Sequence, residues 1–250
     1  MLLEICASSH QSALHAQRAG VHRIELCTEL GVGGLTPSYG LLRRVMAEIS
    51  IPVHVLIRPR SGDFTYADEE LAAMEEDIKI SKELSAAGIV TGALNSDLTI
   101  DTEKTKELLD LARPLNFTFH RAFDWVIDPF AALESLVEIG VDRVLSSGQQ
   151  VNAYLGIELL EALQQQAKNQ LEILPGGGIN LKNINRFKEL GFPAVHTSAS
   201  QIYEGSGVGA LPMNTSKMLK EGIRIESDFK KKSGTSASDQ KRIVREYLKS

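Results

Sequence analysis

The chain has 250 residues, of which 43% are hydrophobic and 24% charged, a composition typical of a globular protein with a large core. The net charge of −5, with no basic face, argues against a nucleic-acid partner, and no apolar run approaches the roughly 20 residues of a membrane span. The two cysteines cannot form a disulfide framework and the N-terminus lacks a basic signal segment, so we expect a cytoplasmic protein without a membrane partner.

Short apolar segments alternate with longer helical segments along the chain. The segment at 38–49 follows Thr36 and Pro37, which suit an N-cap and a first helical turn. Gly20 and Gly88 are suited to end two of the helices. The predicted strands are 2–6, 22–27, 53–57, 89–94, 117–120, 143–147, 171–176 and 194–198, and the predicted helices are 8–20, 38–49, 67–88, 102–112, 129–140, 154–168 and 181–191.

Eight strands that each precede a helix predict an α/β fold, a (β/α)8 barrel in a single domain. We expect residues 1–200 to form the barrel. Residues 201–250 are expected to form a glycine-containing loop, a short helix near 215–221 and a C-terminal helix, 238–250, packed on the barrel as its eighth. A doubly wound sheet is the alternative, although it normally has fewer strands.

Barrel enzymes carry their chemistry where strands end, and the fifth predicted strand ends in the sequence TFHRAFD, residues 118–124. Alternation places Thr118 and His120 on one face of this strand, so His120 is expected to point into the barrel mouth. Asp124 follows after a short loop and could orient His120. The alternative is a structural His–Asp pair that only ties the loop.

The third predicted strand is followed by RPRSGDFTY, residues 58–66, which contains two arginines. Arg58 and Arg60 could bind a carboxylate or phosphate, because guanidinium groups recognise both in a bidentate manner. Arg58 is expected to enter the mouth and contact Glu4 or Glu25. The alternative is an Arg–Asp network that holds the loop.

The loops after the seventh and eighth strands often form the phosphate site of such barrels. Here they contain Gly176, Gly177 and Gly178, followed by His196 and Ser198 on the last strand. Glycines allow backbone N–H groups to approach an anion, so these residues could bind a small anionic ligand. The glycines could equally serve only a tight turn. The sequence GVGG at 31–34 lacks the spacing of a dinucleotide site, so no nucleotide cofactor is expected.

The first two predicted strands end in similar sequences, EIC at 4–6 and ELC at 25–27. Alternation places each glutamate on the same face as its cysteine, and the two strands should be neighbours. Cys6 and Cys27 would then lie close together, and thiolates favour Cu(I) or zinc. The alternative is two ordinary buried cysteines.

Several segments together resemble the CutC family, which is named for copper tolerance. They are LEIC, HRIELC, GGLTPSYG, IRPRSGDFTY, TFHRAFD, SSG, GGGI and HTS, in order between residues 2 and 198. The resemblance implies a (β/α)8 barrel, a cytoplasmic homodimer or homotetramer, a role in copper homeostasis, and copper ligands at Cys6 and Cys27. Leu56 departs from the family pattern, because a methionine is expected there.

Two functions therefore follow. The first is copper homeostasis, with Cu(I) bound by Cys6 and Cys27. The second is an uncharacterised lyase or isomerase acting on a small phosphorylated or carboxylated compound. In that enzyme Glu25 and His120 would be the general acid and base, since their pKa values can lie near neutrality, and Asp124 would orient His120. The two arginines and the glycine loop would bind the anion.

Overall fold

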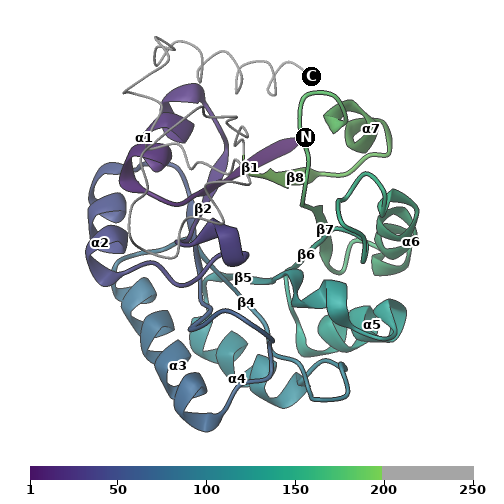
Figure 1. Cartoon of the computed structure of the whole chain (residues 1–250), viewed down its shortest axis with the longest axis horizontal. Coiled ribbons are helices and arrows are strands. Elements are labelled where there is room, and N and C mark those ends of the chain that lie inside the picture. Colours follow the sequence, from purple (N-terminus) through teal and green to yellow (C-terminus); the bar gives the residue numbers. More distant parts are fainter. Residues whose placement is uncertain (199–250) are drawn as a thin grey trace, which may run out of the picture.

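Eight parallel strands alternate with helices around a central barrel (Figure 1). The structure is a computed structural model that describes residues 1–198. The predicted helices at 215–221 and 238–250, and with them the eighth helix, lie outside the described residues. The strands are β1 Leu2–Ala7, β2 Arg23–Leu26, β3 Val53–Leu56, β4 Gly88–Thr91, β5 Asn116–Phe119, β6 Arg143–Ser146, β7 Glu172–Pro175 and β8 Ala194–Thr197. The helices are α1 His10–Ala19, α2 Tyr39–Glu48, α3 Asp68–Glu83, α4 Thr102–Ala112, α5 Pro129–Ile139, α6 Ile157–Ala167 and α7 Ile184–Glu189, with short 3-10 helices η1 Leu30–Val32 and η2 Arg121–Trp125.

The strands follow the order β7-β6-β5-β4-β3-β2-β1-β8, and every pair is parallel. An isolated parallel bridge between Gly176 and His196 joins the two ends of this row and closes the ring. The predicted (β/α)8 fold is therefore confirmed. All eight strand ends meet at one rim, which is where side chains from distant parts of the sequence can form a site.

Side chains alternate between the two faces of each strand, and the two faces differ in chemistry. The outward face is apolar, and Ile24, Val55 and Phe117 pack beneath the helices in the main core. The inward face carries buried charged and polar side chains, including Glu4, Arg23, His54, Thr118 and Arg143. A barrel interior of this kind requires partners for its charges, because an unpaired buried charge is strongly destabilising.

The predicted N-cap of α2 and the predicted end of α3 are wrong. Helix α2 is capped by Ser38, whose side chain accepts a hydrogen bond from the backbone N–H of Leu41, while Thr36 instead accepts from the backbone of Arg58. Helix α3 ends at Glu83, and Gly88 is the first residue of β4. Gly88 faces His54 across the strand pair, and a Cβ atom there would lie 2.7 Å from the imidazole ring. The glycine thus makes room for a core histidine.

Among residues 1–198, no helix has both the length and the apolar character needed to cross a membrane.

Candidate functional site

A cavity of about 780 Å³ opens at the carboxyl ends of the strands. This volume lies in the range of small-molecule sites. Its wall is formed by residues from β1, β2, β3, β6 and β8 and by loops that follow the strands, and includes Cys6, Glu25, Arg58, His120 and His196. The rim predicted from the strand ends is therefore a real concave site.

Cys6 and Cys27 lie side by side at the floor of this cavity. Their Sγ atoms are 3.3 Å apart, and both thiols are free and buried. Cys6 lines the cavity, whereas Cys27 is fully buried. The hydrogen bond to Cys27 and the burial of the thiol, followed by the negative charge of nearby Glu25, raise the pKa of Cys6 well above its usual range. The Cys6 thiol is therefore protonated at neutral pH in the absence of a metal.

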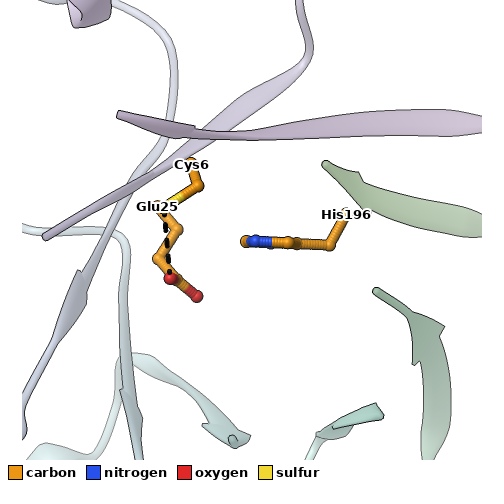
Figure 2. A group of neighbouring side chains, drawn as sticks. All are labelled: Cys6, Glu25 and His196. Atoms are coloured by element: carbon orange, nitrogen blue, oxygen red, sulfur yellow. Dashed lines mark hydrogen bonds between the residues drawn. The ribbon is translucent and has the colours of Figure 1, made fainter. Parts of the chain in front are cut away.

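Glu25 and His196 complete a group of possible metal ligands with Cys6 (Figure 2). One ligand atom from each of the three lies within 4.8 Å of the other two, and the imidazole of His196 points toward Cys6 and Glu25 from the opposite side. Burial raises the pKa of Glu25 to about 6. The Sγ of Cys6 lies 3.8 Å from Oε1 of Glu25, while Oε2 is buried without a partner among the described residues.

A buried ion pair lies beneath this group. Arg23 on β2 donates from Nε to Glu4 on β1, and Nδ1 of His196 lies 2.7 Å from the other carboxylate oxygen of Glu4. Burial opposes ionisation of Glu4, but the hydrogen bond from His196 and the charge of Arg23 outweigh it and hold its pKa well below the usual range. Glu4 is therefore a carboxylate that orients His196.

The predicted contact between Arg58 and a glutamate is wrong. The Arg58 guanidinium donates to the backbone oxygens of Val32, Gly34 and Gly62. Register explains the difference, because Glu25 pairs with His54. Arg58 is four residues further along the chain, roughly 13 Å at the rise of a strand.

The sequence analysis did not single out Arg23, although its position in the second strand indicates an inward side chain. It pairs directly with Glu4 in the register of β1 and β2, and it shares the inward face with Glu25. Alternation alone would have placed Arg23 on the inward face with Glu25, whereas its pairing with Glu4 depends on the register of the two strands.

The predicted pairing of Asp124 with His120 is also wrong. The side chain of Asp124 is buried and accepts hydrogen bonds from the Arg121 side chain, from the hydroxyls of Ser146 and Ser147, and from the backbone of Ser147 and Gln149. Through these hydrogen bonds Asp124 holds the loop after β5 against the loop after β6. These contacts match the alternative in which Asp124 is structural, although its partners are serines and an arginine rather than the histidine.

His120 is held by its own loop. Its Nδ1 accepts from the backbone N–H of Ala122 at 3.4 Å and so caps η2. Its Nε2 is buried and has no partner in the part of the chain that is described. Burial, followed by the charge of Arg58, lowers the pKa of His120 to about 3. The imidazole is neutral at physiological pH.

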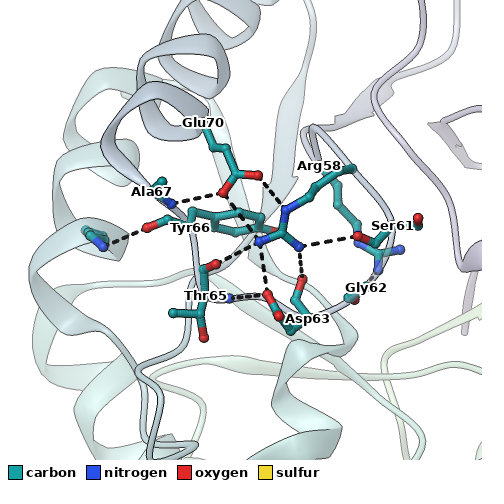
Figure 3. A network of polar contacts seen from close by, with 10 residues as sticks. Arg58, Ser61, Gly62, Asp63, Thr65, Tyr66, Ala67 and Glu70 are labelled. Atoms are coloured by element: carbon teal, nitrogen blue, oxygen red, sulfur yellow. Dashed lines mark hydrogen bonds and ion pairs between the residues drawn. The ribbon is translucent and has the colours of Figure 1, made fainter.

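Arg60 is engaged by its own loop, and Figure 3 labels its partners Asp63, Thr65 and Glu70. It donates to the carboxylates of Glu70 and Asp63, at 2.5 Å and 3.0 Å, and to the backbone oxygen of Thr65. The Glu70 carboxylate also accepts from the backbone N–H of Ala67 at the start of α3. These contacts correspond to the loop-holding alternative, and a role of Arg60 in anion binding stays a prediction.

The glycine loop after β7 lies at the cavity. Gly177 and Gly178 line it and adopt φ values of 101° and 69°, which favour glycine. Ser198 also lines the cavity, while Gly176 belongs to the bridge that closes the barrel. A Cβ atom at Gly177 would lie 3.6 Å from the Arg121 guanidinium, which the sequence analysis did not single out. Anion binding by these glycines and by Ser198 stays a prediction.

The sequence profile of the CutC family matches residues 1–201. The chain belongs to the CutC family. A human protein called copper homeostasis protein cutC homolog is 48% identical over 199 residues, which cover 79% of this chain and 73% of that protein. A Proteus mirabilis family protein CutC is 43% identical over 226 residues, or 90% of this chain and 86% of that one. The solved structure of a Streptococcus agalactiae CutC protein superposes with a TM-score of 0.75 at 37% identity, covering 79% of this chain and 98% of that one.

Proposed function

We propose that this CutC protein binds Cu(I) as its cargo through Cys6 and Cys27. The observation that carries the proposal is the pair of free thiols 3.3 Å apart on adjacent strands. Two sulfur donors match the preference of Cu(I) for soft ligands. The two side chains need no large backbone movement to reach a common ion.

His196 is the natural third ligand. The carboxylate of Glu4 accepts from its Nδ1, so Nε2, once it has lost its proton, is the nitrogen that can bind an ion on the cavity side. A carboxylate behind a ligating histidine is the usual arrangement at metal sites. Glu25 is a harder oxygen donor, so its place in a Cu(I) site is secondary.

The two cysteines differ in their access to the cavity. Cys6 faces the cavity and Cys27 lies behind it with no exposed surface. Cu(I) would therefore meet Cys6 first and Cys27 second. Both protons leave as the thiolates form, because the thiolate is the form that binds metals.

Anaerobic competition titration of Cu(I) against bicinchoninate tests the proposal. We expect one ion per chain, and an affinity lower by roughly 100-fold or more for Cys6→Ser and Cys27→Ser, since outer-shell changes alone cost 10–100-fold. His10→Gln, on the surface of α1, is the matched control and should not change the affinity. Equally tight binding by the Cys6→Ser/Cys27→Ser double variant would refute the thiolate site.

An enzyme is the second candidate, and the cavity favours it. Copper binding needs no space of about 780 Å³, and the cavity exposes functional groups from opposite sides of the barrel. Glu25, with its pKa of about 6, could accept a proton from a substrate. We infer a lyase or isomerase acting on a small phosphorylated or carboxylated compound.

A thermal-shift screen of such compounds, with and without Cu(I), separates the two candidates. An enzyme site predicts stabilisation by at least one compound without copper, because ligands that bind only the folded state raise its stability. Stabilisation by Cu(I) alone would leave copper binding as the sole function.

The cytoplasmic location and the homodimer or homotetramer stay proposals. Exposed Ile127 and Val151, at 73% and 84%, are large apolar side chains that an assembly could cover. Light scattering on the purified chain measures its mass directly. A monomer at micromolar concentration would contradict the assembly.

A further inference from the structure

One wall of the cavity carries a positive charge, that of Arg58, which forms no ion pair with a carboxylate in residues 1–198. Arg58 is buried, and its guanidinium donates to the backbone oxygens of Val32, Gly34 and Gly62. Its Nε has no partner, and no acidic side chain within the described residues forms an ion pair with it. A buried guanidinium cannot lose its proton, so its charge acts on whatever occupies the cavity.

Phe64 joins this arginine to His120. The Arg58 guanidinium lies over the Phe64 ring at 4.8 Å, and the same ring meets His120 edge-on at 4.9 Å. Phe119 supports His120 from another side at 6.0 Å. The imidazole orientation is thus fixed by packing in the absence of a ligand.

The proton on His120 has a definite position. Because Nδ1 accepts a hydrogen bond from the backbone of Ala122, the proton of the neutral ring must be on Nε2. This Nε2–H is buried and unsatisfied in the part of the chain that the structure covers. Unsatisfied buried donors are rare and call for an explanation. A bound ligand with an atom that accepts a hydrogen bond from the His120 Nε2–H would explain this unsatisfied donor.

We propose that the wall formed by Arg58, Phe64 and His120 binds an anionic oxygen of a small organic acid, with His120 as a neutral Nε2–H donor. The inference rests on the second candidate function. It differs from the expectation that His120 acts as a general acid or base. Of the anion-binding groups expected from the sequence, it keeps Arg58, beside β3 and β5, and not the glycine loop.

The charge distribution of the cavity orients such a ligand. Arg58 attracts the anionic end, while the carboxylate of Glu25 lies on the side of β1 and β2 and would repel it. Trp125 and Leu98 line the cavity as exposed apolar side chains that could contact the remainder of the molecule. The ligand is therefore a compact acid whose opposite end faces Glu25 and His196.

The experiment is calorimetric titration of the full chain with three probes: oxalate, inorganic phosphate and 2-phosphoglycolate. Binding of oxalate alone identifies a carboxylate, and binding of the phosphates identifies a phosphoryl group; either supports the proposal. His120→Phe keeps the ring but removes the donor, and should weaken binding roughly tenfold or more, as expected for a hydrogen bond to a charged group. His120→Gln restores an N–H donor and should recover most of the affinity.

Arg44→Lys is the control. Arg44 is an exposed arginine on α2 that pairs with Glu48 and does not line the cavity, so anion binding should not change. The chemical shift of the His120 Nε2 proton should move on addition of the probe that binds. Absence of binding by all three probes, or unchanged binding by His120→Phe, would overturn the inference.

The same titration separates this inference from both proposed functions. Cys6→Ser/Cys27→Ser should retain anion binding even if it loses Cu(I), and loss of anion binding in that variant would overturn the inference. Anion binding that depends on His120, without turnover of any bound acid, would refute the enzyme while supporting the anion site.

Discussion

Nδ1 of His196 lies 2.7 Å from a carboxylate oxygen of Glu4, and this contact bridges β8 and β1 where the barrel closes. Since Glu4 is ionised, it fixes which imidazole nitrogen carries the proton and leaves the other one facing Cys6 and Glu25. The candidate metal site therefore depends on a buried carboxylate that does not itself line the cavity.

Glu4→Gln should strongly destabilise the protein. The substitution leaves the buried Arg23 without its carboxylate, and breaking a buried ion pair in this way costs about 3–5 kcal/mol. Urea unfolding measures the loss. Glu172→Gln is the control, because Glu172 pairs with Arg143 but its side chain is 29% exposed. An equal decrease in the free energy of unfolding for both variants would contradict a special role for Glu4.

Glu25→Gln should stabilise the protein at high pH. The folded-state pKa of Glu25, about 6, lies above its ordinary value of 4.5. The favourable contribution of its protonated form is present below about pH 4.5 and is lost as the pH rises through about 6. At pH 8 the variant should be more stable by about 2 kcal/mol. Urea unfolding at pH 5 and pH 8 tests this, and a less stable variant at pH 8 would contradict it.

Cu(I) affinity should increase with pH. The hydrogen bond to Cys27 and burial keep the pKa of Cys6 high, so Cu(I) must displace protons on binding. Each displaced proton makes the affinity change by up to about tenfold per pH unit. Competition titrations at pH 6, 7 and 8 measure the slope, and calorimetry in two buffers counts the protons. An affinity independent of pH would argue against ligation by the thiols.

Asp124→Asn should destabilise the loops after β5 and β6 without altering His120. An amide nitrogen cannot accept the hydrogen bonds from Ser147 and Arg121, and a loss of about 2 kcal/mol is expected for buried donors left unsatisfied. Urea unfolding measures the loss, and ¹⁵N chemical shifts report the His120 tautomer. A changed tautomer would show that Asp124 acts on His120 after all.

Local patterns predicted the elements better than their boundaries. Alternation placed Glu4, Cys6, Glu25 and His120 on the inward face, and the structure confirms this for all four. The cap at Ser38 and the early end of α3 were missed, because Thr36 and Gly88 have tertiary partners that local propensity does not include.

The sequence by itself determined the fold class and the rim on which the candidate site lies. The eightfold repeat of strand and helix and the polar residues at the strand ends are local properties of the chain, and helix and strand periods follow from backbone geometry. The tertiary structure alone decided which charged groups meet. Glu4 pairs with Arg23 rather than Arg58, and Asp124 with Ser146 and Ser147 rather than His120, because these contacts depend on the register between strands. Register is set by the stagger of the closed barrel, which no single strand encodes.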